Sequence, residues 1–263
     1  MKWFLAVVAC ISLNSCIIYP SMHYSVAQNV PLFTQKDEAR VTVATGNEAI
    51  GLQCAYAFSP SWAVMGSYSG GLDEFPAPDY SDGGFDNGTR WSSELAVGHF
   101  QPIGTKGIFE IYGGAERYYR SFSNSWIDPG SGGQNSSALS TYCTKPFVQL
   151  DLGSRNTGRH SFGLSLKLGL LMYDHFSYLT TDSIGKSVQS ASSYNSSPAL
   201  IVEPCFTYRL GGKYISFQAQ AGLSITNSQV NNINSGSGLS EPFFFNLGLS
   251  VRLFKDGNYK AAN

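Results

Sequence analysis

Charged residues are scarce in this chain. Asp, Glu, Lys and Arg make up 13% of its 263 residues, about half of the roughly 25% that is usual in soluble domains. The formal net charge is −1 and Lys and Arg do not cluster, so the sequence offers no surface that would neutralise nucleic-acid phosphates. The apolar stretch Trp3 to Ile11 is too short to cross a bilayer as a helix.

Cysteine is also sparse. Beyond the first sixteen residues only Cys54, Cys143 and Cys205 remain. An odd number permits at most one disulfide within the chain, and the spacings match no metal-binding motif. We interpret these cysteines as small packing residues, and we predict neither a metal site nor a cofactor.

What the sequence has instead is a regular alternation of apolar and polar residues. In 215–225, Ser216, Gln218, Gln220, Gly222 and Ser224 interleave with Ile, Phe, Ala and Leu, and 243–253 repeats the pattern. Successive side chains of a strand point to opposite faces, so each segment has one face suited to water and one suited to lipid. This alternation is typical of a transmembrane β-barrel.

Connection lengths alternate as well. We expect ten strands, at 38–46, 49–58, 62–70, 90–100, 107–118, 143–154, 160–174, 198–209, 214–226 and 242–254. The connections after the second, fourth, sixth and eighth are short, and those after the third, fifth, seventh and ninth are long and rich in Gly, Ser, Asn and Asp. The sequence therefore predicts an all-β, closed antiparallel barrel of about eight to twelve strands, with short periplasmic turns and long external loops.

The two faces differ in charge. The outward phase of seven of these strands holds no charged residue, as expected if a Lys or Arg in lipid costs about 2–4 kcal/mol. The inward phase holds Arg40, Glu94, Glu110, Glu116, Asp151, Lys167, Glu203, Arg209 and Arg252. We predict that these nine side chains pair inside the lumen as a structural network, with a selective pore or a catalytic interior as alternatives.

Two features refine this prediction. Pro204 lies within a predicted strand and removes a ladder hydrogen bond, so we expect a β-bulge there. Aromatic residues near strand ends are expected to form interfacial girdles, namely Trp62, Tyr68, Trp91, Tyr118, Tyr119, Tyr173 and Tyr208, although Trp91 could equally lie in an exposed loop.

The N-terminus has the features of a targeting signal. Lys2 supplies a positive charge, Trp3 to Ile11 an apolar core, and Leu13-Asn14-Ser15-Cys16 resembles the lipobox of bacterial lipoproteins. We therefore expect a signal peptide over 1–15 and lipid on Cys16; an ordinary secretory signal is the alternative. Residues 16–37 would form a periplasmic tether leading into the barrel at 38–254, and 255–263 a tail.

A run of residues at this junction resembles a known group of proteins. Tyr19-Pro20, Asn29-Val30-Pro31-Leu32-Phe33 and Lys36-Asp37-Glu38 precede Val41, Val43 and Gly46. The run is similar to one in small, mostly uncharacterised outer-membrane β-barrel proteins of Bacteroidetes-type bacteria, N-x-P-L-F-x-x-K-G-E, with Asp37 where that pattern usually has Gly. The resemblance implies the compartment and the fold, and implies no reaction.

An enzymatic interpretation has one candidate place. His175 and Ser177 share a strand face in Tyr173-Asp174-His175-Phe176-Ser177, near an expected external rim. Such residues are similar to those of omptin proteases and lipid A deacylases, yet a base needs a partner that orients it. Asp174 would point away from that face, and the acidic loop residues Asp73, Glu74 and Asp79 are the only further candidates.

We therefore expect a protein of the bacterial outer membrane, with its N-terminus in the periplasm and with membrane lipid as its surroundings. Its role would be structural or binding, because a barrel fixes the roots of external loops and leaves their sequence free. It could serve as an accessory subunit with an envelope protein as partner. A narrow channel and a hydrolase sited at the rim are the alternatives.

Overall fold

The computed structural model describes residues 23–46, 49–76, 85–127, 134–154, 159–181, 187–190, 198–226 and 243–254. These residues form strands joined in one antiparallel sheet. The strands are β1 (Glu38–Gly46), β2 (Ala49–Tyr56), β3 (Trp62–Pro76), β4 (Phe85–Ile103), β5 (Gly107–Ile127), β6 (Gln134–Ser154), β7 (His160–Thr181), β8 (Ser187–Ser190), β9 (Ala199–Gly211), β10 (Ile215–Leu223), β11 (Ile225–Thr226) and β12 (Phe243–Phe254).

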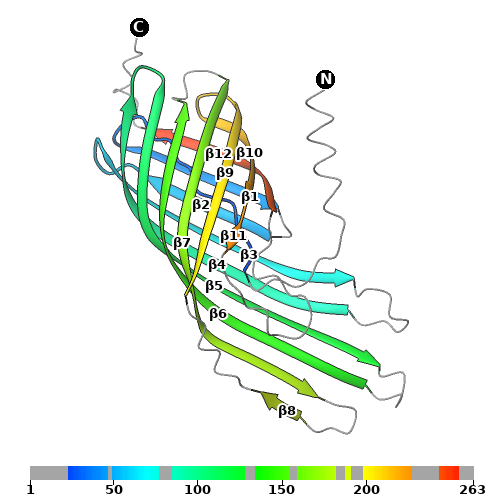
Figure 1. Ribbon diagram of the computed structural model, residues 1–263. Coiled ribbons are helices and arrows are strands. Elements are labelled where there is room, and N and C mark those ends of the chain that lie inside the picture. Colours follow the sequence, from blue (N-terminus) through cyan, green and yellow to red (C-terminus); the bar gives the residue numbers. More distant parts are fainter. Residues whose placement is uncertain are drawn as a thin grey trace, which may run out of the picture.

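The sheet closes on itself. Each long strand pairs with its neighbour in the chain, β1 pairs with β12, and β7 pairs with β9, which leaves β8 and β11 as short additions at the margin. The closed structure is a ten-stranded antiparallel barrel (Figure 1). The predicted fold class is confirmed. Strands with a period of two give a sheet one apolar and one polar face, and closure into a barrel places the polar face inside and the apolar face outside.

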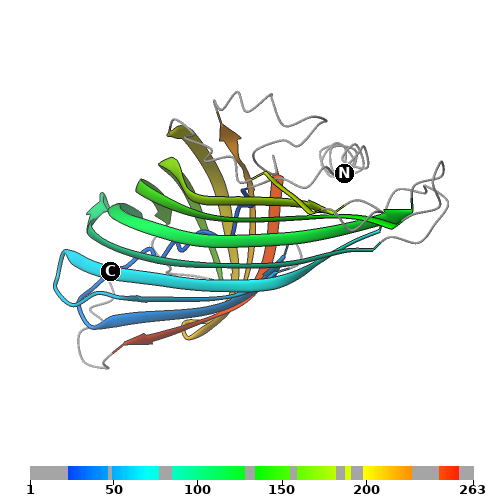
Figure 2. The ribbon, with the colours of Figure 1, turned by 90° about the horizontal axis from the view of Figure 1, so that it is seen from below.

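Strands β3 to β7 are longer than the alternation indicated. We expected loops over 71–89, 119–142 and 175–197, but β5 and β6 each have 21 residues and β7 has 22. Much of this Ser-rich sequence is paired, for example Ser121 with Ser140 and Ser123 with Ala138. The expectation of loops was wrong there, because backbone pairing across a hairpin does not require apolar side chains. The long strands project from one end of the barrel (Figures 1 and 2).

We call the end from which these strands project the hairpin end. The opposite end, which we call the short-turn end, carries the connections between β2 and β3, β4 and β5, β6 and β7, and β9 and β10. The last strand, β12, also finishes there, because Phe254 pairs with Glu38 at the start of β1.

The expected bulge at Pro204 is absent. Pro204 pairs in register with Leu166 of β7, and on its other side the ladder with β10 stops at Cys205 and resumes in β11 at Val202 without a change of register. The missing N–H group of Pro204 is therefore accommodated by a gap in the ladder between β9 and its neighbours β10 and β11, and not by an extra residue in β9. The irregularity in register lies between Tyr142 and Cys143 instead.

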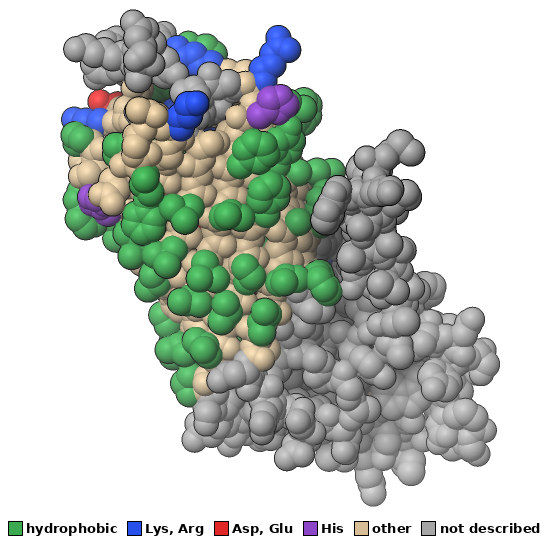
Figure 3. All heavy atoms as spheres, turned by 45° about the horizontal axis from the view of Figure 1, so that its top comes forward, with side chains coloured by type: hydrophobic (Ala, Val, Ile, Leu, Met, Phe, Trp, Pro, Cys, Tyr) green, Lys and Arg blue, Asp and Glu red, His purple; other side chains and the backbone are tan. Residues whose placement is uncertain are grey.

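The outer face is apolar over most of its height, and the exposed pair Arg117 and Asp174 lies towards the hairpin end. Every outward residue that the sequence indicated is at least partly exposed, and Phe217, Ile50 and Leu95 are exposed by 70%, 67% and 66%. Hydrophobic side chains cover the middle of the visible face, and the visible charges gather at its upper end (Figure 3). A surface of this kind is stable in contact with lipid and unfavourable in water.

Aromatic residues mark both ends of this apolar surface, with two exceptions. Trp91, Tyr119 and Tyr142 pack together towards the hairpin end, and Trp62 and Tyr208 lie near the short-turn end. Tyr118 and Tyr173 do not join the girdle as expected, because their rings meet inside the barrel and Tyr118 is buried. Their phase along the strand, rather than their closeness to its end, decides the side on which they lie.

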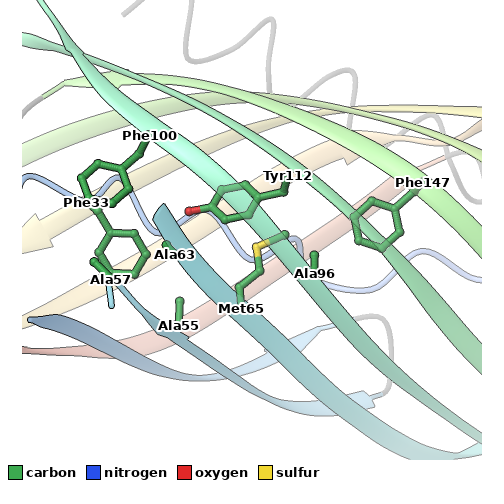
Figure 4. Close-up of a cluster of buried hydrophobic side chains, with 9 residues drawn as sticks. All are labelled: Phe33, Ala55, Ala57, Ala63, Met65, Ala96, Phe100, Tyr112 and Phe147. Atoms are coloured by element: carbon green, nitrogen blue, oxygen red, sulfur yellow. The ribbon is translucent and has the colours of Figure 1, made fainter. Parts of the chain in front are cut away.

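The barrel interior is packed rather than hollow at the short-turn end. Phe33, which precedes β1, packs there with Phe100, Met65, Tyr112 and several alanines of β2 to β4 (Figure 4). The rings of Phe33 and Phe100 are 5.6 Å apart. Among the described residues, no helix is long and apolar enough to cross a membrane.

The position of an added charge along the outer face should decide how much stability it costs. Leu95→Arg places a cation on the lipid-facing surface of β4 and should lower the free energy of unfolding by about 2–4 kcal/mol. Thr89→Arg is the matched control, since Thr89 is exposed on the same strand towards the hairpin end, and it should change stability by less than about 0.5 kcal/mol. Urea unfolding in lipid vesicles measures both; equal losses would contradict a lipid-facing Leu95.

Candidate functional site: a lumen filled by the N-terminal segment

Residues 23–33 lie inside the barrel. We call them the luminal segment. Its buried members include His23, Tyr24, Val30, Leu32 and Phe33, with exposed fractions of 2% or less. The expectation of a periplasmic tether is wrong for these residues. Their sequence has no strand period, and only the surrounding strands provide partners for a single extended chain without a ladder.

Four consecutive carbonyls of the luminal segment each accept a hydrogen bond from a barrel side chain. The amides of Gln53, Gln220 and Gln149 donate to the carbonyl oxygens of residues 27, 28 and 29, each at 2.7 Å, and the guanidinium of Arg209 donates to that of residue 30. The donors come from four different strands, β2, β10, β6 and β9. A buried backbone carbonyl without a partner costs about 1–3 kcal/mol, so these side chains make burial of the segment possible.

Glu110 binds the last two residues of the luminal segment, Leu32 and Phe33. Its two carboxylate oxygens accept the backbone N–H groups of Leu32 and Phe33, at 3.0 and 2.6 Å. Leu32 has a φ of 55°, a conformation that costs a bulky residue of the order of 1–3 kcal/mol. The paired bonds to Glu110 and the contact of Leu32 with Ile108 offset that cost.

Side-chain amides of the segment bond back to the barrel. Asn29 donates to the carbonyls of Cys54 and Gly66, on β2 and β3, at 3.0 and 3.3 Å. Gln28 donates to the carbonyl of Glu203 at 2.9 Å. The segment is therefore bonded to strands on all sides of the lumen. It cannot leave the lumen without breaking hydrogen bonds to several strands at once.

Two glycines make room for the segment. A Cβ at Gly153 would lie 2.4 Å from Leu32 Cδ1, and a Cβ at Gly163 would lie 3.3 Å from Val30. Both glycines occupy the short-turn end of neighbouring strands, where Gly153 pairs with Gly163. A side chain at either position would take the space that Leu32 and Val30 occupy.

Contacts along β5 give the direction of the segment. Leu32 and Phe33 bond to Glu110, three residues after Gly107 at the short-turn end. The ring of His23 lies 5.1 Å from that of Tyr118, eleven residues after Gly107. The chain thus runs from His23, towards the hairpin end, down to Phe33, and enters β1 at the short-turn end.

A group of paired charged side chains surrounds the part of the luminal segment that lies towards the hairpin end. Lys145 Nζ lies 2.6 Å from Glu116 and 2.8 Å from Glu203, and Glu203 also contacts His23 Nε2 at 3.3 Å and accepts a hydrogen bond from Ser25 at 2.9 Å. All of these side chains are buried. Glu203 therefore joins the barrel wall to the luminal segment.

Two more charged clusters lie in the lumen. Arg252 makes a paired contact with Glu38, at 2.6 and 2.8 Å, and also donates to Thr34 at the end of the lead-in to β1. Lys167 Nζ lies 2.6 Å from Glu94 and 4.5 Å from the centre of the Phe147 ring. Towards the hairpin end the guanidiniums of Arg90 and Arg120 lie 4.8 and 5.9 Å from the ring centre of Tyr24.

All nine lumen charges named from the sequence have buried side chains; they are Arg40, Glu94, Glu110, Glu116, Asp151, Lys167, Glu203, Arg209 and Arg252. The sequence reasoning missed five buried residues, namely His23, Glu38, Arg90, Arg120 and Lys145. Lys145 is in phase with Gln149 and Asp151, so the alternation could have indicated it. For His23 no signal existed, because its partner Glu203 is 180 residues away along the chain.

The run at 29–38 that resembles other outer-membrane barrel proteins supplies part of the contacts in the lumen. Asn29 to Phe33 supply the contacts described above, and Glu38 holds Arg252. Asp37, which stands where the similar run usually has Gly, has a φ of 59°. Glycine adopts this left-handed conformation without cost, which gives a physical reason for Gly at that position.

The candidate catalytic group is not assembled by the described side chains. His175 and Ser177 pair with Tyr142 and Ser140 in β6, while their side chains lie outside the described part of the structure. The carboxylate of Asp174 is engaged by Arg117 and by Thr144, at the outer rim. Cys16 and the predicted signal peptide, like the tail at 255–263, fall outside the described residues. In the described ranges no group of three or more His, Cys, Asp or Glu could hold a metal.

A closed barrel with an apolar outer face, and with charges in its interior and at its two ends, is the architecture of an outer-membrane β-barrel. No protein-family model matches the sequence, and neither does any curated protein. In fold the chain is similar to the translocator domain of the autotransporter NalP from Neisseria meningitidis, at 12% identity and a TM-score of 0.43, over 81% of this chain and 86% of that one.

It is also similar to the outer membrane protease OmpT from Escherichia coli, at 8% identity and a TM-score of 0.49, over 86% of this chain and 99% of that one. A major outer membrane protein from Thermus thermophilus shows 13% identity and a TM-score of 0.42, over 82% of this chain and 99% of that one. At these identities the likeness concerns the fold and not the activity.

Docking of the luminal segment can be tested through Gly153. Gly153→Ala should lower stability by about 1–3 kcal/mol, because the new methyl group meets Leu32. Gly113→Ala is the matched control, since a Cβ there meets nothing within 4 Å. Thermal unfolding in detergent measures both. Adding Leu32→Ala to Gly153→Ala should cost less than the sum of the two single changes; strict additivity would contradict the contact.

Removal of the buried charge of Glu203 should lower the free energy of unfolding more than removal of the exposed charge of Asp174. Glu203→Gln leaves Lys145 and His23 without their shared carboxylate and should cost roughly 3–5 kcal/mol. Asp174→Asn removes a partner of Arg117 where both side chains are about 40% exposed, and should cost less than about 1 kcal/mol. Denaturant titration of the refolded barrel distinguishes these values; comparable losses would contradict a buried network.

Proposed function

We propose that this protein is an outer-membrane β-barrel with a structural or binding role, in which the barrel is a sealed anchor and the long hairpins bind an envelope partner. The observation that carries the proposal is the filled lumen. Four consecutive carbonyls and two N–H groups of the luminal segment are bonded to barrel side chains. A solute would have to break these bonds to pass.

The projecting strands supply the surface for a partner. A strand needs about 9–11 residues to cross a membrane, and β5, β6 and β7 have 21 to 22. At about 3.3 Å per residue, the extra ten residues or so add roughly 30 Å to the length of each strand beyond the apolar surface. Because adjacent strands support one another there, the projection is a sheet and not a set of separate loops.

This sheet has the composition of a binding surface that stays soluble when unoccupied. The β5–β6 hairpin is rich in Ser, Asn and Gly, and its outer part has paired backbone groups with small polar side chains such as Ser121 and Ser140. A protein partner could contact either face of the sheet or extend its edge by backbone pairing.

The narrow channel and the hydrolase have less support. A channel needs a continuous water path, and the described lumen is occupied from the level of Glu110 to that of Tyr118. A rim hydrolase needs a base with an orienting partner, and Asp174, the nearest acid in the sequence, is held by Arg117 and Thr144.

Conductance distinguishes a sealed barrel from a channel. The full chain in planar bilayers should show no steady ion current. A variant that lacks residues 23–33 should show small discrete openings, because the inward polar side chains then border a water-filled space. Open-channel current from the full chain would contradict the sealed barrel.

Shortening a hairpin tests the binding role. Removal of 121–124 together with 137–140 deletes four matched pairs and preserves the register of β5 with β6. The shortened protein should still fold, as judged by heat-modifiable migration on gels. When a photoreactive residue replaces Thr144, the full-length protein should form a cross-link to its partner in cells, and the shortened protein should not. The same probe at Phe217, which faces lipid, is the control. A product that survives the deletion would place binding elsewhere.

A further inference from the structure

The direction of the luminal segment determines where the chain upstream of it must go. We propose that the chain preceding His23 leaves the barrel through the hairpin end, so that the predicted lipidation site Cys16 lies on the same side of the membrane as the long hairpins. Acyl chains on Cys16 would then enter the leaflet at that end. This goes against a periplasmic N-terminus, and it rests on the proposed function only in naming the hairpin end as external.

The first support is the order of contacts. Along β5 the segment passes from Glu110, bonded to Leu32 and Phe33, to Tyr118, against His23. The adjacent residue, Tyr24, also packs near Tyr118, and its ring centre lies 4.8 and 5.9 Å from the guanidiniums of Arg90 and Arg120, which belong to the hairpin-end parts of β4 and β5. At His23 the chain has therefore reached the hairpin-end limit of the membrane-spanning part of the barrel.

The second support is that no return path exists through the described lumen. The luminal segment is bonded to β2, β3, β5, β6, β9 and β10. Glycines at 153 and 163 are needed to fit even one pass of the chain at the short-turn end. A second extended chain would displace these contacts.

The third support is the length of chain available. Seven residue steps separate Cys16 from His23, and they span at most about 25 Å when fully extended. The hydrocarbon core is about 30 Å thick. A return outside the barrel would also expose backbone polar groups to lipid, at several kcal/mol each. Cys16 therefore cannot reach the leaflet at the short-turn end.

Three epitope tags test the proposal in intact cells. One is inserted between Ile18 and Tyr19, the second between Gly130 and Ser131 in the β5–β6 connection, and the third follows Asn263, beyond β12. We expect antibody to label the first two tags on intact cells and the third only after the outer membrane is permeabilised. An N-terminal tag labelled only together with the C-terminal tag would overturn the proposal.

The same experiment separates this inference from the proposed function. If the β5–β6 tag is hidden and the C-terminal tag is accessible, the hairpins do not face outward and the proposed function fails. Even in that case the inference predicts that the N-terminal tag and the β5–β6 tag lie on the same side of the membrane, so both tags should be hidden. A Cys16→Ala form should keep the location of its N-terminal tag while losing acyl labelling, since the contacts in the lumen, and not the lipid, set the path of the chain.

Discussion

The structure depends on satisfying the backbone of an extended chain inside a barrel. Strands satisfy their own polar groups by pairing, but the luminal segment has no ladder, and buried carbonyls without partners would make its burial unfavourable. Glutamines at 53, 149 and 220, together with Arg209 and Glu110, provide the missing partners. The inward polar residues are thus not a water-facing lining but the binding site of the segment.

This constraint also explains the charges in the lumen. Buried ions are costly unless they are paired and hydrogen-bonded, and the lumen pairs them in clusters that include the segment, through His23 and Glu203, or its continuation, through Thr34 and Glu38. Removal of the segment would therefore leave charges with fewer partners as well as a cavity. The wall and the segment therefore stabilise each other.

The sealed lumen that we propose would leave the hairpin end as the surface available for binding. There β3 to β7 continue as a paired sheet beyond the apolar surface, and the segment reaches the same end at His23. A barrel of ten strands is small, so one extended chain is enough to fill it. Under the two proposals above, the binding surface and the chain that precedes His23 lie at the same end of the barrel.

The sequence by itself determined the strands, their faces and the barrel class, because a period of two is local: Ile50 and Leu52, or Glu110 and Tyr112, share a face whatever surrounds them. It did not determine the luminal segment, since 23–33 has no period and its partners lie 25 to 192 residues away. It also did not distinguish loops from the Ser-rich ends of β5 and β6, where pairing depends on the neighbouring strand. Only closure of the barrel decided these features, because it brings side chains from many strands around one extended chain.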